Sequence, residues 1–131
     1  MLKQSKGTVK MTAKERRYKD KIAQKQYFVK HMDNIGLSRK YTGYFQIVDI
    51  MHLLINVKIK VVSFSRQIYP IIAKMYNSNA TTIERNIRNL INKCWDNHIK
   101  HNLTAYWNSQ KRPSCCQFIY LIKNYIIDQF S

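Results

Sequence analysis

An amphipathic pattern over residues 80–95 constrains the fold of this chain more than any other stretch. Apolar side chains recur there at intervals of three and four residues, at Ile83, Ile87, Leu90, Ile91 and Cys94. This spacing places them along one side of an α-helix, where they need a partner surface to be buried against. A preceding segment repeats the pattern with Ile68, Ile72 and Met75, and the turn-favouring residues 76–79 lie between the two. The sequence therefore predicts two helices joined by a short polar turn.

The start of the first of these helices depends on Ser65 and Pro70. Ser65 is a candidate N-cap, because its hydroxyl can accept a hydrogen bond from a free amide of the first turn. Pro70 would then lie beyond the first turn, where its missing N–H costs a backbone hydrogen bond. Either the helix bends at Pro70, or residues 65–69 form a separate turn and Pro70 opens the helix; we favour the bend.

The side of the 80–95 helix that faces away from the apolar stripe is polar and basic. Its residues are Thr81, Thr82, Glu84, Arg85, Arg88, Asn89 and Asn92, with Arg85 nearly opposite the stripe. Arginine can donate two parallel hydrogen bonds to guanine, and a carboxylate can accept one from cytosine. The pattern is typical of a helix-turn-helix DNA reader. An ordinary helical hairpin with a solvated basic face remains an alternative, and Glu84 and Arg88 are spaced to pair with each other.

Helical signals cover most of the remaining chain. Residues 12–15 have the spacing of a capping box, and Gly36 stands where a left-handed C-cap residue belongs. A second helix is expected over about residues 43–57, with an apolar stripe of Phe45, Val48, Met51 and Ile55 that Ile47, Ile50 and Leu54 widen. Lys58–Val62 alternates like a strand, but it has no second strand to pair with, and we interpret it as a connector or short helix.

Towards the C-terminus, Asp96 and Asn97 are expected to end the 80–95 helix, and residues 98–107 to hold one short helix. Ser114 is expected to cap an apolar last helix, which either closes the core or offers a face to a second copy of the chain. Three glycines and two prolines in 131 residues leave little room for the turns of an all-β fold. The sequence therefore predicts an all-α, compact bundle of about six helices.

The formal charge of +16, from 23 basic and 7 acidic residues, favours a polyanionic partner, either nucleic acid or an anionic membrane surface. Residues 1–30 carry half of this surplus, with ten Lys or Arg against Glu15 and Asp20. We expect residues 1–21 to form a basic tail and helix extension, and residues 22–131 to form the domain. The extension either keeps the protein solvated or lies along phosphates.

Other functions have weaker support. No apolar run approaches the roughly 20 residues that span a bilayer, and no secretory signal precedes the basic segment, so a cytoplasmic, nucleoid-associated protein is expected. The odd number of cysteines fits reduced thiols. Cys94, His98 and His101, with Cys115-Cys116, have a spacing that permits a metal site, but no Cys-x-x-Cys pair supports one. With no phosphate loop or nucleophile motif, we expect no enzyme, no cofactor and no small-molecule substrate.

Several short motifs resemble one known family. The resemblance is to the C-terminal DNA-binding effector domain of the sporulation-initiation master response regulator of endospore-forming bacteria, over roughly residues 22–130. The motifs that carry it are Ile35-Gly36-Leu37, Gly43-Tyr44, Tyr69-Pro70-x-Ile72-Ala73-Lys74, Asn77, Ile83-Glu84-Arg85-x-Ile87-Arg88, Trp95, Arg112-Pro113-Ser114 and Phe118-Ile119.

This resemblance implies a six-helix fold whose recognition helix reads a box related to TGTCGAA, with tandem copies on neighbouring boxes. It implies base contacts by Glu84 and Arg85, a phosphate contact by Arg88, and backbone contacts by Ser65 and Arg66. Thr82 stands where the family has an arginine expected to read guanine, and Asn89 replaces a histidine. Losing one such arginine should cost about 1–3 kcal/mol of discrimination, so the target differs or is read less strictly.

Family proteins carry a phospho-accepting receiver ahead of this domain. Only the basic tail stands there in this sequence, so the phosphorylation switch is not carried over. We therefore expect a sequence-preferring, double-stranded DNA-binding transcription regulator with helix 80–95 in the major groove. Its base-contacting residues would be Thr82, Glu84 and Arg85, and its backbone-contacting residues Ser65, Arg66, Thr81, Arg88 and Asn89.

Three further expectations concern partners. A homodimer on tandem sites would use the C-terminal helix. A non-specific nucleic-acid-binding accessory protein is the first alternative function, because charge alone would support it. A protein-interaction module derived from the DNA-binding fold is the second, with the apolar last helix as its contact surface.

Overall fold

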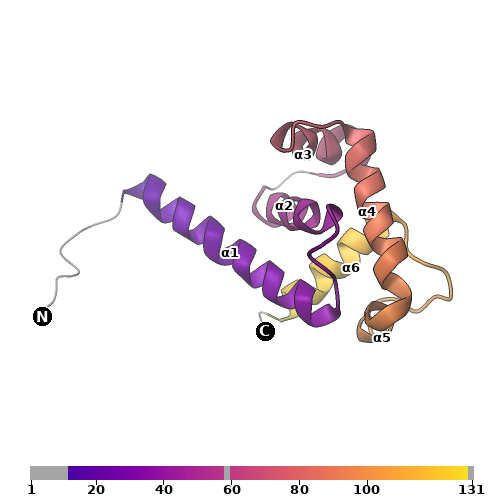
Figure 1. The fold of residues 1–131 in the computed structure, drawn as a ribbon. Coiled ribbons are helices and arrows are strands. Elements are labelled where there is room, and N and C mark those ends of the chain that lie inside the picture. The colour runs from indigo at the N-terminus through magenta and orange to yellow at the C-terminus, as the bar shows by residue number, and fades with distance from the viewer. Residues whose placement is uncertain (1–11, 58–59, 130–131) are drawn as a thin grey trace, which may run out of the picture.

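The computed structural model describes residues 12–57 and 60–129 of the chain. The predictions for the tail at residues 1–11 and for Lys58 and Ile59 lie outside these ranges. Every regular element in the described part is helical, which confirms the all-α class and the bundle of about six helices (Figure 1). In chain order the elements are α1 (Ala13–Ile35), α2 (Gly43–Asn56), the π-helical turn η2 (Phe64–Ile68), α3 (Tyr69–Met75), α4 (Ala80–Cys94), the π-helical turn η3 (Trp95–Ile99), α5 (Lys100–Asn102) and α6 (Cys115–Asp128).

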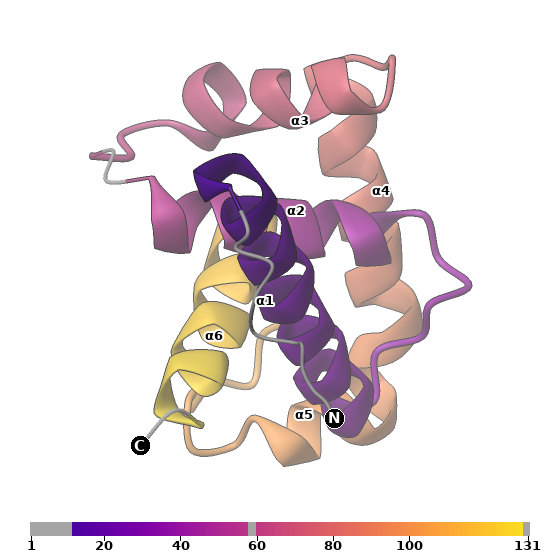
Figure 2. The same cartoon turned by 90° about the vertical axis from the view of Figure 1, so that its left-hand side faces the viewer.

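Both ends of α1 follow the sequence signals. The Thr12 side chain accepts a hydrogen bond from the Glu15 amide at 3.0 Å, and the Glu15 carboxylate accepts one from the Thr12 amide at 3.2 Å, which completes the predicted capping box. Gly36 ends the helix with φ 114°, a left-handed conformation that favours glycine. The helix runs unbroken across residues 21 and 22, and its N-terminal half projects away from the body (Figures 1 and 2).

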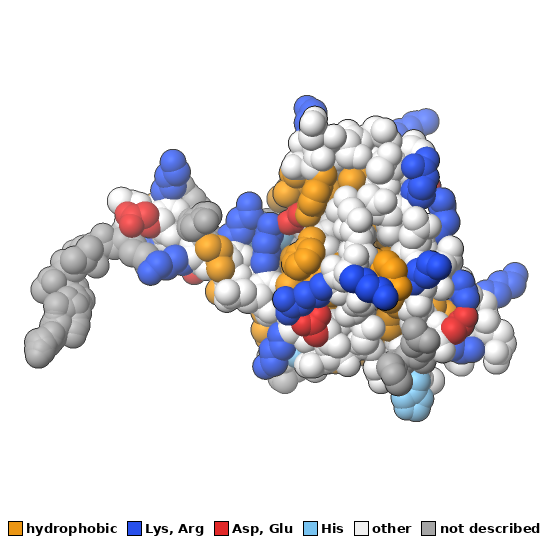
Figure 3. Space-filling view, viewed as in Figure 1, with side chains coloured by type: hydrophobic (Ala, Val, Ile, Leu, Met, Phe, Trp, Pro, Cys, Tyr) orange, Lys and Arg blue, Asp and Glu red, His pale blue; other side chains and the backbone are white. Residues whose placement is uncertain are grey.

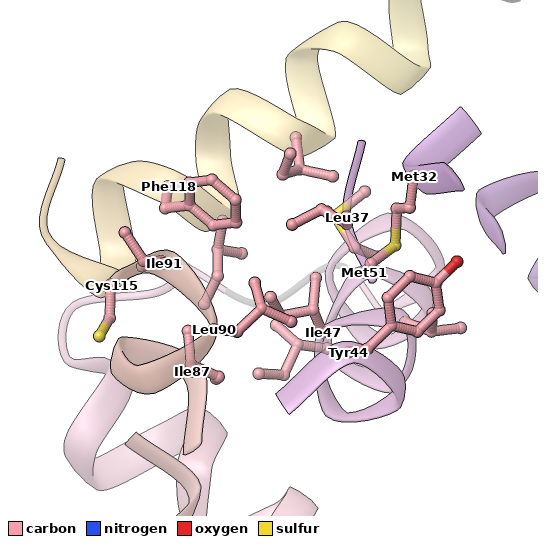
Figure 4. Packing of buried hydrophobic residues seen from close by; sticks show 14 of the residues in the cluster. Met32, Leu37, Tyr44, Ile47, Met51, Ile87, Leu90, Ile91, Cys115 and Phe118 are labelled. Carbon is pink, nitrogen blue, oxygen red and sulfur yellow. The ribbon is translucent and has the colours of Figure 1, made fainter. Parts of the chain in front are cut away.

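The core forms where α2 lies between α1 and α4, with α6 packed against all three. Figure 4 shows Ile87, Leu90 and Ile91 of α4 facing Ile47 of α2 and Phe118 of α6. The apolar stripe predicted for α4 is buried over its whole length. Buried side chains of α6 close the core from a second side, so its apolar character is accounted for mainly by packing within the chain; these residues are Phe118, Ile119, Leu121, Ile122 and Ile126.

The stripe predicted for α2 is wrong at one position. Phe45 is 44% exposed, and the neighbouring Tyr44 is fully buried in its place. The Tyr44 hydroxyl has one proton, which it donates to Asp33 Oδ1 at 2.6 Å, with the Val29 carbonyl as a second acceptor at 3.1 Å, so the ring can be buried with its polar group satisfied. Tyr44 therefore fastens α2 to α1, and Phe45 is left on the surface.

The predicted start of the first helix of the pair is also wrong. Ser63, and not Ser65, is the N-cap, because its hydroxyl accepts from the Arg66 amide at 3.3 Å. Residues 64–68 form the separate turn η2, in which the Tyr69 amide bonds to the Phe64 carbonyl. Pro70 lies in the first turn of α3, where its missing N–H breaks no helical bond. The expected bend at Pro70 is therefore wrong. The alternative, a turn followed by a new helix, describes the structure.

α4 ends at Cys94, but helical structure does not stop at Asp96 and Asn97 as predicted. The chain continues through η3 into α5. The reason is a run of buried apolar side chains at intervals of four residues, namely Ile91, Trp95, Ile99 and Leu103, which keeps the segment against the core. Ser114 caps α6 as predicted, with a full capping box to Gln117. None of the helices in the described ranges combines the length and apolar character needed to cross a membrane.

Candidate nucleic-acid interface

α3, a four-residue turn and α4 form the predicted helix-turn-helix. Asn77 adopts a positive φ of 51° in the turn, and the Ser78 amide donates to the Ala73 carbonyl at 2.8 Å. Asn79 then caps α4, because its side-chain oxygen accepts from the Thr82 amide at 2.9 Å. These local bonds fix where α4 begins and the angle at which it leaves the turn.

The outer side of α4 is exposed over most of its length. α4 lies along one edge of the molecule in Figure 1, and Figure 3 shows Lys and Arg side chains gathered over that edge. The apolar side faces α2 and α6, and the opposite side carries four of the predicted contact residues, which are all exposed: Thr81, Arg85, Arg88 and Asn89. This is the convex, basic helix surface that the amphipathic pattern predicts.

Arg85 differs from Arg88, which is paired with Glu84. It is exposed, and no residue in the described ranges forms a hydrogen bond or ion pair with its guanidinium. All of its donors are therefore available to a ligand that approaches α4 from solvent. A planar guanidinium with free donors suits a guanine edge or a phosphate.

Glu84 and Arg88 form the ion pair that their spacing allows. Arg88 Nη2 lies 2.7 Å from Glu84 Oε1, and the two side chains are 54% and 36% exposed. An exposed pair of this type contributes little to stability, so it can exchange for contacts with a ligand at small cost. Thr82 is half-buried beside them, at the first turn of the helix.

The structure brings the predicted backbone-contacting residues of η2 next to the start of α4. Ser65, Thr81 and Glu84 line one shallow recess of about 190 Å³, together with Tyr69 and Ala80. Arg66 is exposed on the same turn as Ser65. The predicted site residues therefore lie on two adjacent elements, with Arg88 and Asn89 further along α4.

Arg112 is a basic residue on this face that was not assigned a role from the sequence. It donates to Asn92 Oδ1 at 3.2 Å and forms an ion pair with Asp96, so the loop before α6 is tied to the outer side of α4 and η3. Twenty residues separate Arg112 from Asn92. Helical periodicity gives no signal for such a long-range contact.

The cysteines are packing residues in this structure. Cys94 is buried in the α4 stripe, and the Cys115 thiol lies 3.7 Å from the Glu84 carbonyl. Burial raises the pKa of the Cys115 thiol, which disfavours the thiolate that a metal would need. The described side chains include no group of three potential metal ligands, and the side chain of His98 lies outside them.

A comparison with family models agrees with this geometry. The model described as "Sporulation initiation factor Spo0A C terminal" matches residues 28–126, from the second half of α1 into the last turn of α6. The chain belongs to this family. Spo0A C-terminal domains are sequence-specific DNA-binding domains of transcription regulators, so the resemblance seen in the sequence is confirmed. Residues 12–27, which include the projecting half of α1, precede the match.

Proposed function

We propose that this Spo0A C-terminal family member regulates transcription at the nucleoid by placing α4 in the major groove of double-stranded DNA. The observation that carries the proposal is the exposed guanidinium of Arg85, unpaired among the described residues, on the solvent side of a helix whose other side is buried. A single α-helix fits the major groove, and its outward side chains reach the base edges. Arg85 would donate two hydrogen bonds to guanine.

Two neighbours would complete base reading. Glu84 would accept from cytosine N4 when Arg88 turns from the carboxylate to a phosphate, an exchange that the exposed pair permits. Thr82 would meet a base edge near the helix N-terminus. Its short side chain offers fewer contacts than the arginine that the family resemblance implies at this position, so we expect discrimination at one base pair to be relaxed.

Phosphate contacts would surround these residues. Ser65 and Thr81, in one recess, would donate hydroxyl hydrogen bonds, and Arg66, Arg88 and Asn89 would neutralise or bind the flanking phosphates. The N-terminus of α4 adds the positive end of its helix dipole. Such contacts set the orientation of the protein but carry no sequence information.

The test compares DNA binding by the variants Arg85→Ala and Arg66→Ala. A preferred duplex is first selected from a randomised pool, and the affinities for it and for random duplex are measured at physiological salt. Arg85→Ala should lower the affinity for the preferred duplex about 5- to 150-fold, since one bidentate contact is worth about 1–3 kcal/mol. Its affinity for random duplex should change little. Arg66→Ala should lower the affinities for the preferred and the random duplex by the same factor. Equal losses for Arg85→Ala would refute base reading by this residue.

Non-specific nucleic-acid binding is the second candidate. The charge of +16 favours it, because phosphate contacts alone give substantial affinity. The ratio of specific to non-specific affinity separates the two candidates. A true reader should favour its site by at least about a thousandfold at physiological salt.

Tandem binding would bring two copies together through α6. Tyr120 and Ile127 are the exposed large apolar side chains of that helix, and they are the residues that we propose for such a contact. Tyr120→Ser should then remove cooperativity on tandem sites without changing affinity for a single site.

A further inference from the structure

A groove lies between the middle of α1, α2 and the end of α3. It has a volume of about 710 Å³. Ile22 and Val29 of α1 line it on one side, and Phe45 and Val48 of α2 on the other. Tyr76, the C-cap of α3, closes one end. Figure 3 shows hydrophobic side chains on this face of the molecule, between α1 and the body, with Lys and Arg side chains around them.

Large apolar side chains are left open to solvent in this groove. Phe45 is 44% exposed, Ile22 is 39% exposed and Tyr76 is 38% exposed. Three such residues in one hollow, at the junction of three helices, differ from the single exposed apolar residues of an ordinary surface. An apolar hollow between helices is the kind of surface that binds the apolar side of a docked helix, which presents residues at intervals of three and four.

The charged residues that line the groove indicate the charge of its partner. Its lining includes three basic residues, Lys25, Lys30 and Arg39, and one acidic residue, Asp49. Asp49 is already engaged, because Lys25 Nζ lies 2.5 Å from its Oδ1 and the Tyr76 hydroxyl donates to its other oxygen. Lys30 is exposed, with no polar partner in the described ranges. Arg39 pairs with Asp33 at 2.6 Å in an exposed ion pair, so among the described residues the carboxylates beside the groove are already paired. A ligand would therefore meet one unpaired cation, Lys30, and a second, Arg39, whose exposed pair can exchange at small cost.

A second copy of the chain does not fit this pattern, since each copy would bring a charge of +16. We propose that the groove binds an acidic amphipathic helix of another protein, with its apolar side on Ile22, Phe45 and Val48 and its carboxylates beside Lys30 and Arg39. Complementary charge would steer and orient this partner, and the buried apolar contacts would hold it.

The groove and the outer side of α4 can be occupied together. α2 packs against both α1 and α4 and lies between them (Figure 1). The groove is lined by α1, α2 and the end of α3, and no residue of α4 lines it, whereas Arg85 and Arg88 are exposed on α4. The proposed partner could thus be held on DNA by this chain. That bridging role rests on the proposed DNA binding, whereas docking in the groove does not.

The probe for this groove is a fluorescein-labelled synthetic peptide of about five helical turns, with Leu along one side and Glu on the others. Its affinity for the full chain is measured by fluorescence anisotropy at physiological salt, with and without a saturating DNA duplex. A peptide of the same composition in scrambled order, which lacks an apolar side, controls for attraction to the basic surface. The amphipathic peptide should bind at least about tenfold more tightly than the scrambled one, because only it can bury Leu in the groove.

Phe45→Ser is the test variant and Val62→Ser the matched control, since Val62 is an exposed apolar residue outside the groove. Phe45→Ser should lower the affinity for the amphipathic peptide about tenfold, as expected for the loss of a central apolar contact. Val62→Ser should leave this affinity unchanged. Thermal unfolding of both variants checks that they fold.

Three results would overturn the proposal: equal affinity for the two peptides, equal loss in the two variants, or self-association of the free chain that Phe45→Ser abolishes. The last result would assign the groove to a second copy. Failure of DNA reading would leave the DNA-free peptide measurement unaffected, so the two proposals fail separately. With a saturating duplex present, unchanged peptide affinity supports simultaneous binding, and competition refutes the bridging role.

Discussion

Gly43 at the start of α2 lies directly against the backbone of Asn86 in the middle of α4. A Cβ atom on Gly43 would lie 2.5 Å from the Asn86 carbonyl oxygen and 2.9 Å from its carbonyl carbon. Neither backbone atom can turn aside as a flexible side chain would. Near this contact Asn86 also donates to Gln46 Oε1 at 3.2 Å, so the crossing of α2 and α4 is fixed by both close packing and a hydrogen bond.

We predict that Gly43→Ala forces α2 and α4 apart and destabilises the fold by about 1–3 kcal/mol, the usual cost of overpacking. Denaturant unfolding measures this change. Thr42→Ala is the control, because Thr42 is exposed and its side chain makes no capping bond. If Gly43→Ala and Thr42→Ala are equally stable, the contact is not tight in solution.

Asn79→Ala should lower the free energy of unfolding by about 1 kcal/mol, because the Thr82 amide loses its capping acceptor. Asn79→Asp keeps the acceptor and should be close to wild type in stability. The measurement is thermal unfolding of both variants. Equal losses for the two would mean that another group caps α4.

Sequence periodicity predicted the elements whose signals are local. The capping box at Thr12, the N-cap at Ser114, the left-handed Gly36 and the α4 stripe each depend on residues within a few positions of one another. The wrong predictions concern which of two similar residues takes a position, and contacts between distant parts of the chain decide this. Ser63 and Ser65 are equally good caps by type, and Tyr44 displaces Phe45 from the core because its hydroxyl reaches Asp33 on another helix.

The candidate site shows the same division. Helical spacing alone placed Arg85, Arg88 and Asn89 on the solvent side of α4, and they are exposed. The position of Ser65 beside Thr81 depends on how η2 packs; the family resemblance implied a backbone-contacting role for Ser65 but not this position. The groove beside Phe45 had no sequence signal, because it depends on how α1, α2 and the end of α3 pack together.

Glu84→Gln separates the two roles of the Glu84–Arg88 pair. If the pair only stabilises the helix, the variant should lose less than about 0.5 kcal/mol of stability and keep its DNA preference. We predict instead an altered preference at one base pair, since the amide can donate where the carboxylate only accepts. Selection from a randomised pool, repeated with the variant, checks this. An unchanged consensus would limit Glu84 to the ion pair.

Removal of residues 1–11 should reduce the salt dependence of DNA binding. The segment contains Lys3, Lys6 and Lys10 and no acidic residue. If all three contact phosphates, the slope of log affinity against log salt should fall by up to about 3, with base preference unchanged. Replacing the three lysines with glutamine in the full-length chain is the matched control for length. A slope that stays constant in both variants would show that the tail does not contact DNA.

His31 should make the fold less stable below neutral pH. Both ring nitrogens are buried and have no hydrogen-bond partner within residues 12–57 and 60–129, and the ring packs against Tyr27 and Tyr125. Burial, with a smaller effect from Lys30, lowers its pKa below the ordinary value of 6.5. The unfolded chain therefore binds the proton first, and stability should fall as pH drops below about 6.5.

His31→Phe keeps the ring packing and should flatten this decline in denaturant unfolding from pH 7.5 to 5. His52, whose pKa burial also lowers, is the comparison: if His52→Gln alone flattens the curve, His31 is not the source.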